Sequence, residues 1–276
     1  MSSPAAPAAG VSRPLSGGFR NVHLLVELVK RDFTMRFTGS ALGVAWAVLQ
    51  PLSLVLLYWF VFTQLLVGDD SGVPGRPRVG AGEDYVFFLI CGLLVWLGFN
   101  EGVIRGTTSI ADNATLVRKL TFRSELLVLV PNISALLFEM IGLALFILYV
   151  ALQGGTLWGL WLLPFALTLQ LALQAGISWI LATTHVFFRD VIQVLGFALS
   201  ILFWLSPIIY RAPADWAMFF AWNPLTPLLG LFRSAVLAAP LPPAASIVFL
   251  LIVALSIFAL GLGFFRRAQA SLADLI

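Results

Sequence analysis

Two carboxylates lie within or beside apolar stretches of this sequence, and they are the side chains best placed to do chemistry. Glu101 precedes Arg105 by four residues, the spacing of an ion pair along a helix, so such a pair is its simplest role. Glu139 has no oppositely charged neighbour in the sequence. Because ionisable groups inside a membrane are costly and usually functional, Glu139 is the stronger candidate. It could contact a substrate, a neighbouring helix or a second subunit.

The remaining reactive side chains predict no catalytic or metal site. His23 and His185 stand apart from carboxylates and cysteines at any metal-ligand spacing, and the single cysteine, Cys91, can form no intrachain disulfide. A phosphate-binding P-loop needs a lysine that follows a glycine, whereas Lys30 and Lys119 do not. We therefore expect no enzymatic activity, and no cofactor or metal, in the chain itself.

The composition is that of a membrane protein. Hydrophobic residues make up 60% of the 276 positions and charged residues only 11%, whereas soluble domains carry roughly 25% charged residues. The mean hydropathy is +0.99. The net charge of +3 is no sign of nucleic-acid binding, because the basic residues stand at the ends of apolar stretches and form no separate basic surface. We expect membrane lipids, and no nucleic acid, as partners.

Six apolar stretches reach the length of about 20 residues that a membrane-spanning helix needs. They cover residues 41–67, 85–104, 126–150, 158–188, 191–210 and 244–265. Pro51 is expected to kink the first stretch, and Pro164 interrupts the fourth. The pattern predicts an all-α polytopic membrane protein with six transmembrane helices in residues 39–276.

Two segments precede the first span. Residues 1–20 are rich in Pro, Ala, Ser and Gly, lack the apolar core of a secretory signal, and are predicted to be a flexible cytoplasmic tail. Residues 21–38 have the period of an amphipathic helix that lies in the membrane interface. Its apolar face is formed by Val22, Leu25, Val26, Val29, Phe33 and Phe37, and its polar face by His23, Glu27, Lys30, Arg31 and Thr34.

The distribution of basic residues predicts that both termini are cytoplasmic. Alternate sides of a six-span chain would hold twelve and four of the 16 Lys and Arg residues. The richer side carries both tails and the loops after the second and fourth spans. Because cytoplasmic loops are enriched in Lys and Arg, this is the cytoplasmic side.

The outer segment, residues 211–243, contains two apolar helices that are too short to cross a membrane. The first carries the aromatic residues Trp216, Phe219, Phe220 and Trp222. The second is predicted to begin at Thr226-Pro227, a helix cap followed by proline, and to run to Ala239. We expect a re-entrant pair that dips into the outer leaflet; interfacial helices are the alternative.

Aromatic residues recur at helical spacing in two spans. Tyr58 and Phe62 are four residues apart in the first span. In the fifth span one face carries Phe197, Ser200, Ile201 and Trp204. An aromatic face along a pore could stack against sugar rings, although ordinary helix packing explains the same spacing.

Two cytoplasmic loops could bind a partner. Residues 107–125 include a short predicted helix that Asp112 or Asn113 caps and that runs through Lys119. The fourth loop is only Phe187-Phe188-Arg189-Asp190-Val191. A solvated turn does not need two phenylalanines before an Arg-Asp pair, so this loop is a plausible docking contact.

The order and spacing of six segments resemble the permease subunit of type-two ABC exporters. The segments are KRDFTMRFTGSALGVAWAVLQPL (30–52), ICGLLVW (90–96), NATLVRKLTF (113–122), FFRDV (187–191), SPIIY (206–210) and NPLTPLLGLFR (223–233). Within that group the sequence resembles the bacterial exporters of lipid-linked polysaccharides, above all O-antigen permeases, with capsule and teichoic-acid permeases near by.

This resemblance implies a homodimer in the bacterial inner membrane that carries two separate ATPase subunits, which would bind ATP and magnesium. It implies ATPase-coupling contacts in the two cytoplasmic loops, at Asn113, Leu116, Arg118, Lys119, Phe188, Arg189 and Asp190. It also implies a channel lined by the first and fifth spans, with Tyr58, Phe62, Phe197, Ser200, Ile201 and Trp204, and an outer gate with Trp216, Phe219, Phe220 and Trp222.

The implied substrate is a polysaccharide linked to undecaprenyl pyrophosphate. It would enter near the interface helix, where Arg31 and Arg36 could bind the pyrophosphate through charge-assisted hydrogen bonds. Simple anchoring of the cytoplasmic side is the alternative role of these arginines. Two other functions stay open, namely export of a capsule, teichoic acid, simple lipid or drug by the same fold, and a membrane-embedded glycosyl- or acyltransferase. The transferase would need paired acids or a His/Asp cluster at a membrane face, which the sequence lacks.

Overall fold

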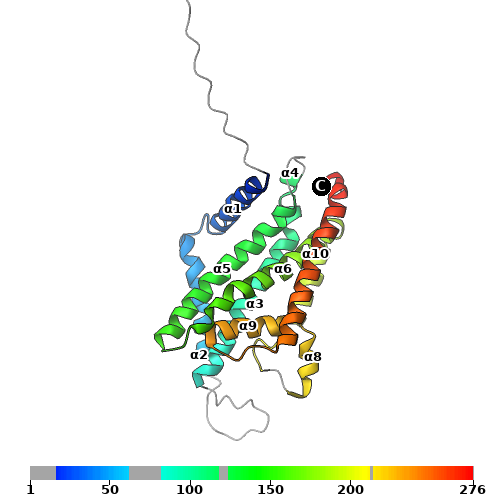
Figure 1. Ribbon diagram of the computed structural model, residues 1–276. Helices are drawn as coiled ribbons and strands as arrows, with labels where there is room; N and C mark the ends of the chain where they lie inside the picture. The colour runs from blue at the N-terminus through cyan, green and yellow to red at the C-terminus, as the bar shows by residue number, and fades with distance from the viewer. Residues whose placement is uncertain (1–16, 62–81, 118–123, 212–213, 276) are drawn as a thin grey trace, which may run out of the picture.

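The computed structural model describes residues 17–61, 82–117, 124–211 and 214–275, and every regular element in these ranges is a helix (Figure 1). The first half contains α1 (Gly17–Met35), the 3₁₀ turn η1 (Gly43–Ala45), α2 (Trp46–Phe60), α3 (Gly82–Asp112), α4 (Ala114–Val117) and α5 (Ser124–Leu152). The second half contains η3 (Trp158–Leu162), α6 (Leu163–Phe187), α7 (Val191–Leu205), η4 (Ala214–Trp216), α8 (Ala217–Ala221), α9 (Leu225–Leu237) and α10 (Ala244–Leu275).

Four helices are long and apolar enough to cross a membrane, and they are the predicted second, third, fourth and sixth spans. Their ranges are Tyr85–Asp112, Ser124–Leu152, Trp158–Phe187 and Ala244–Gln269. Three shorter apolar helices cover Trp46–Tyr58, Val191–Leu205 and Leu225–Leu237. The described part of the chain is therefore that of an all-helical polytopic membrane protein. Within the described residues, the helices at the predicted first and fifth spans are shorter than expected.

The fifth predicted span, 191–210, is wrong at its C-terminal end. Helix α7 has 15 residues and ends at Leu205, so it is about 22 Å long. Ser206 is extended, with φ −104° and ψ 142°. Because Pro207 disfavours helical geometry at the residue before it, the helix stops there and residues 206–210 continue as a non-helical segment.

Two further boundary predictions are corrected. Pro164 does not interrupt a helix but lies in the first turn of α6, directly after η3, where its missing N–H costs nothing. Thr226 is not a helix cap, because α9 begins at Leu225. The Oδ1 atom of Asn223 instead accepts a hydrogen bond of 2.9 Å from the backbone N–H of Leu225.

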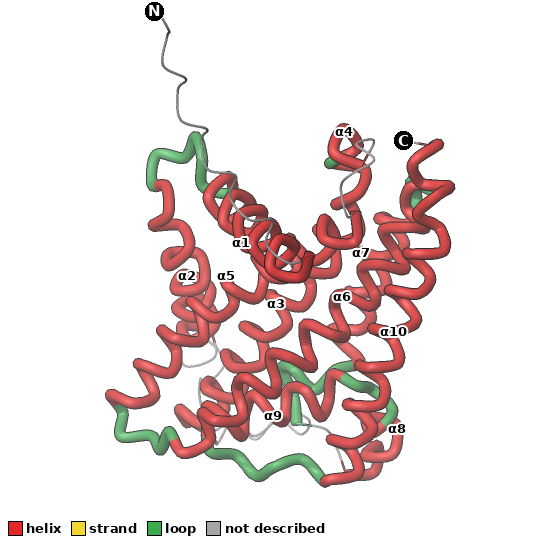
Figure 2. The backbone as a smooth tube through the Cα atoms, turned by 45° about the horizontal axis from the view of Figure 1, so that its top comes forward, coloured by secondary structure: helices red, strands yellow, loops and turns green. Residues whose placement is uncertain are grey.

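The bundle has two distinct ends. Helix α4 and the C-terminus lie at one end, and α8 and α9 lie at the other (Figures 1 and 2). Helix α9 packs against α3, α6 and η3. It ends at Leu237, after which Ala238 adopts the left-handed conformation with φ 51°. The short helices α8 and α9 thus lie at the end of the bundle opposite the C-terminus, and the prediction that this end faces outward stays a prediction.

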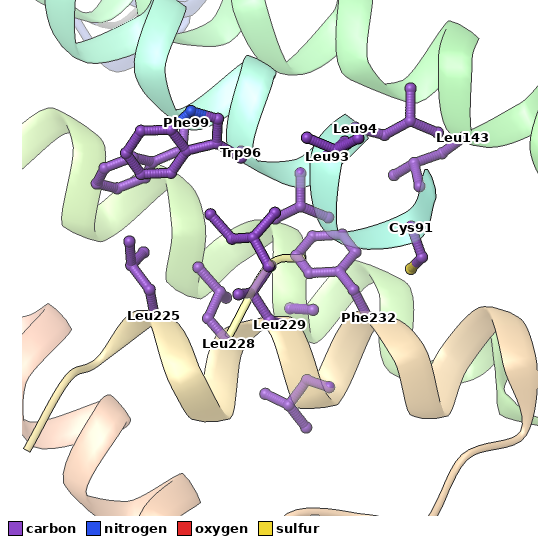
Figure 3. Packing of buried hydrophobic residues seen from close by; sticks show 14 of the residues in the cluster. Cys91, Leu93, Leu94, Trp96, Phe99, Leu143, Leu225, Leu228, Leu229 and Phe232 are labelled. Atoms are coloured by element: carbon purple, nitrogen blue, oxygen red, sulfur yellow. The ribbon is translucent and has the colours of Figure 1, made fainter. Parts of the chain in front are cut away.

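The core is centred on α3. Of the residues in its most apolar stretch, 67% are buried, whereas the corresponding share for α10, which packs on the edge, is 17%. Figure 3 shows the side chains of Leu93, Trp96 and Phe99 of α3 packed near Leu228 and Phe232 of α9. Helices α5 and α6 complete this core against α3.

Helix α1 packs against α5 with only part of its apolar face. It begins at Gly17, within the predicted tail. Val29 and Phe37 are buried, and the Phe37 ring stacks on Phe138 of α5 with centroids 6.4 Å apart. Val22 and Val26 stay exposed, which leaves apolar surface of the kind that an interfacial helix presents to lipid.

Candidate functional site

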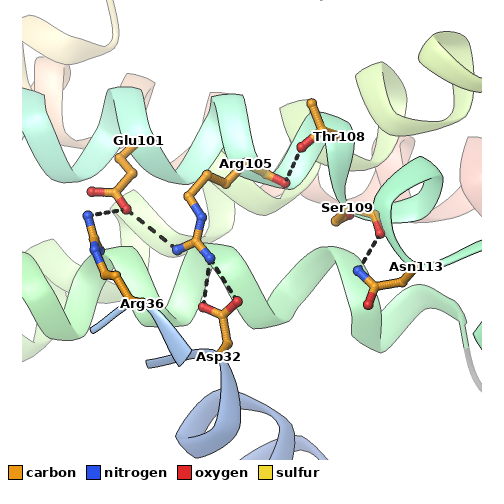
Figure 4. A network of polar contacts seen from close by, with 7 residues as sticks. All are labelled: Asp32, Arg36, Glu101, Arg105, Thr108, Ser109 and Asn113. Atoms are coloured by element: carbon orange, nitrogen blue, oxygen red, sulfur yellow. Dashed lines mark hydrogen bonds and ion pairs between the residues drawn. The ribbon is translucent and has the colours of Figure 1, made fainter. Parts of the chain in front are cut away.

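A network of four charged side chains joins α1 to α3 (Figure 4). The Nη2 atom of Arg105 donates to both carboxylate oxygens of Asp32, at 2.7 and 2.9 Å. Arg36 forms an ion pair with Glu101, whose Oε1 lies 2.6 Å from its Nη2. Asp32 lies in α1 and Arg36 directly follows its last residue, while Glu101 and Arg105 both lie in α3, so the network holds the end of α1 in one register against α3.

The predicted pair of Glu101 and Arg105 is present, but it is the weaker contact. Nη1 of Arg105 lies 3.5 Å from Oε1 of Glu101. The closer partner of Glu101 is Arg36, whose guanidinium also lies over the Phe138 ring, 4.1 Å from its centroid. Arg36, predicted as a pyrophosphate contact, is therefore engaged by α3 and α5 in this conformation.

A polar cavity of about 310 Å³ lies beside this network, between α1, α3 and α5. The charged and amide side chains that line it are Arg31, Asp32, Arg105, Asp112 and Asn113. The Nδ2 atom of Asn113 donates to the backbone oxygen of Ser109 at 2.9 Å. The structure thus brings Arg31, a predicted entry residue, to the same cavity as Asn113, a predicted coupling residue.

The structure describes only part of the first predicted coupling loop but all of the second. Helix α4 is a single turn that contains Leu116, and Arg118 and Lys119 lie outside the described residues. Between α6 and α7, Phe188 is 67% exposed, and Arg189 and Asp190 are exposed as well. The loop thus exposes Phe188 beside two charged residues, and its role as an ATPase contact stays a prediction.

The predicted channel residues do not all meet within one chain. Phe197, Ser200, Ile201 and Trp204 share one exposed face of α7, where Phe197 is 70% and Trp204 65% exposed. Tyr58 packs instead against the main core from α2, which lies on α3 and α5. Phe62 lies outside the described residues.

The predicted gate aromatics form edge-to-face contacts at the end of the bundle that carries α8 and α9. The Trp216 and Phe219 rings are 6.3 Å apart, and Trp222 contacts Phe249 of α10 at 6.1 Å. Phe220 is the buried member of the set and contacts Tyr210 at 5.9 Å. Trp216, Phe219 and Trp222 are exposed. The aromatic cluster therefore attaches α8 to its neighbours while it presents apolar surface outward.

Comparison with known sequences assigns the chain to a family. The sequence profile of the ABC-2 type transporter family matches residues 23–237. The chain belongs to this family. It is 27% identical to an O-antigen export system permease protein of Myxococcus xanthus over 80% of its own length and 83% of the relative's. A Klebsiella pneumoniae O-antigen export system permease protein is 25% identical over 75% and 77% of the two chains. The polysialic acid transport protein of Escherichia coli is 24% identical over 92% and 97%.

The interior of this ABC-2 permease contains a polar seam that the sequence reasoning did not find. Nε2 of Gln170 donates to Oε2 of Glu139 at 2.6 Å, and Nε2 of Gln174 donates to the backbone oxygen of Gly98 at 2.8 Å. Further along the seam, Asn132 of α5 donates to Ser178 of α6 at 3.2 Å. The seam therefore joins α3, α5 and α6 by hydrogen bonds.

Glycines of α3 make room for this seam. A Cβ atom at Gly102 or Gly106 would lie 3.2 or 2.7 Å from side-chain atoms of Asn132, and a Cβ at Gly98 would overlap Glu139. The repeat of Gly98, Gly102 and Gly106, one helical turn apart, was the signal for close helix packing in a membrane. Of the roles left open for Glu139, contact with a neighbouring helix is the one the geometry supports.

Proposed function

We propose that this chain is the membrane-spanning permease of an ATP-driven exporter that moves a polysaccharide linked to undecaprenyl pyrophosphate, of the O-antigen type, across the bacterial inner membrane. The observation that carries the proposal is the similarity to O-antigen export permeases across 75–80% of this chain and 77–83% of theirs. The chain has no P-loop of its own, so a separate ATPase subunit would supply the energy.

The permease would act as a homodimer that carries two copies of the ATPase subunit. The apolar face of α7, with Phe197 and Trp204 more than half exposed, supports this assembly. A second copy that faced it would enclose a route lined by rings, and rings stack on the apolar faces of sugars. The ATPase would contact the loop of Phe188 and the segment from Asn113 to Lys119.

Entry of the substrate would begin at the polar cavity between α1, α3 and α5. Arg31 is exposed at its rim and forms no ion pair within the described part of the chain, so its guanidinium is available to a pyrophosphate oxygen. Arg36 keeps a buried Nη1 atom without a protein partner. Its Nη2 would have to leave Glu101 for both arginines to hold the diphosphate together.

A second substrate class has one observation in its favour. The similarity to the polysialic acid transport protein covers 92% of this chain and 97% of that one, although at 24% identity. An exporter of a capsule-type polysaccharide would share the same permease architecture. The two substrates can be told apart by identifying the lipid to which the transported glycan is linked.

The proposal is tested by reconstituting the full-length chain with its candidate ATPase in sealed vesicles that contain a lipid-linked glycan. We expect glycan translocation to require both subunits and ATP, and to be lost when Arg118 and Lys119 are replaced by Glu. Replacement of Arg267, an exposed residue near the C-terminal end of α10, by Glu is the control for reversal of a surface charge. Modification of a lipid-linked sugar by the chain alone, without ATP, would contradict the exporter assignment.

A further inference from the structure

A cavity with two arginines lies at the end of the bundle that carries α8 and α9. Its volume is about 620 Å³, and it is bounded by the beginning of α3, the end of α5 and the end of α9. This size falls within the roughly 300–1,000 Å³ of ligand pockets. Arg211 and Arg233 both line it. In the part of the chain that the structure describes, neither arginine is paired with a carboxylate.

Arg233 is held in place by the backbone. It is only 6% exposed, its Nε donates to the carbonyl oxygen of Phe88 at 3.3 Å, and its Nη2 donates to that of Ile208 at 3.0 Å. A Cβ atom at Gly92 would lie 2.6 Å from Nη2, so a larger residue there would displace the guanidinium from this position. These bonds orient the guanidinium but leave its positive charge without an anion.

Both arginines approach one aromatic ring. The guanidinium carbon of Arg233 lies 3.4 Å from the centroid of Phe88, and that of Arg211 lies 5.5 Å from it. Arginine does not lose its proton in proteins, so two positive charges share this ring. Because like charges repel in a partly buried site, an anion that bound both would be favoured there.

An apolar groove lies next to the basic cavity. Its volume is about 310 Å³, and it is lined from α2 by Leu52 and Leu56 and from α5 by Phe146 and Tyr149. Phe87 lines both the groove and the basic cavity. Leu52 and Leu56 are 40% and 54% exposed, so the groove opens sideways between α2 and α5. A ligand with an anionic head and an apolar chain would match both spaces.

We propose that this combined site binds an anionic glycerophospholipid of the surrounding bilayer, with its phosphate between Arg211 and Arg233 and one acyl chain in the groove. The planar guanidinium matches phosphate oxygens in pairs. The opening between α2 and α5 is the side from which a bilayer lipid would enter. The proposal does not depend on which glycan is exported.

The test measures lipid binding by the full-length protein in phosphatidylcholine nanodiscs. A small fraction of dansyl-labelled phosphatidylglycerol is added, and energy transfer from tryptophan reports its binding. We expect Arg211→Gln and Arg233→Gln each to weaken the apparent affinity about tenfold, the loss of a charge-assisted hydrogen bond. Arg267→Gln, which removes an exposed arginine near the C-terminal end of α10, is the matched control and should leave the affinity unchanged.

Several outcomes would overturn the proposal. Equal binding of dansyl-phosphatidylcholine would mean that the site does not recognise an anionic headgroup. An equal loss in Arg267→Gln would mean that only the total charge matters. Displacement of the label by a polyprenyl diphosphate at lower concentration than by unlabelled phosphatidylglycerol would assign the site to a carrier lipid instead. Since Arg233→Gln could also disturb folding, Arg211→Gln, at an exposed position, decides the matter on its own.

Discussion

Replacement of Gly98 by alanine tests whether the polar seam between α3, α5 and α6 holds the bundle together. A Cβ atom at this position would lie 2.7 Å from Cδ and 2.8 Å from Cβ of Glu139. Real Cβ atoms do not approach so closely, so either α3 and α5 must separate or the Glu139 side chain must leave Gln170. Overpacking of this kind costs about 1–3 kcal/mol. Alanine returns up to about 1 kcal/mol through its better helix propensity.

With the full helix-propensity gain, the net expectation for Gly98→Ala is a loss of about 0–2 kcal/mol of unfolding free energy. Gly263→Ala in α10 is the matched control, because no atom lies within 4 Å of a Cβ there. It should be neutral or stabilising by up to about 1 kcal/mol. The assay is reversible unfolding of the detergent-solubilised protein by a denaturing detergent, followed by far-UV circular dichroism.

A double mutant ties the effect to the named contact. Glu139→Ala alone leaves the Nε2 donor of Gln170 without its partner in a buried site, at a cost of about 1–3 kcal/mol. In the double mutant Gly98→Ala/Glu139→Ala the new methyl group enters the space that Glu139 vacates. The loss of unfolding free energy in the double mutant should therefore be smaller than the sum of the losses in the two single mutants. If Gly98→Ala unfolds like Gly263→Ala, or if the two losses are additive, the seam is not the tight contact described above.

Three further substitutions test the ion pairs between α1 and α3, the exposed face of α7 and the loop between α6 and α7. Arg105→Ala should release α1 from α3, speed hydrogen exchange in α1 and lower the unfolding free energy by about 1–2 kcal/mol. The loss is smaller than for a fully buried ion pair because the Arg105 side chain is 34% exposed, and Lys30→Ala is the control. Trp204→Ala, on the exposed face of α7, should change stability by less than about 0.5 kcal/mol yet reduce glycan export in vesicles, and unchanged export would argue against a channel-lining role. Phe188→Asp should abolish the stimulation of ATP hydrolysis by the permease with normal membrane insertion, and an unaffected ATPase rate would remove this loop from the coupling surface.

The long spans could be predicted because their signal is local. A window of about 20 apolar residues is enough to locate a spanning helix, and α3, α5 and α10 contain such windows. The end of α7 was predictable too, since Ser206-Pro207 marks a helix boundary in the sequence. It was missed because the hydropathy of residues 206–210 continues that of the helix, and hydropathy does not distinguish a helix from a buried extended segment.

The partners of the charged and polar residues could not be predicted because they are distant in sequence. The local rule gave Arg105 as the partner of Glu101, whereas the closer contact is Arg36, from the turn that follows α1. Gln170 is 31 residues from Glu139. Which helices meet depends on the packing of the whole bundle, and a single sequence carries that information only indirectly, as in the glycine repeat of α3.

The contacts of α3 also limit how α1 can move. One end of α3 holds α1 through Glu101 and Arg105, and the other end holds the buried Arg233 of α9 through the backbone of Phe88. Between these points Gly98 packs tightly on α5 and Gly102 on α5 and α6, which leaves α3 little room to bend. A partner that displaced α1 would therefore have two routes. It would have to break the ion pairs at Glu101 and Arg105, or it would have to move α3 as a unit and carry α9 with it.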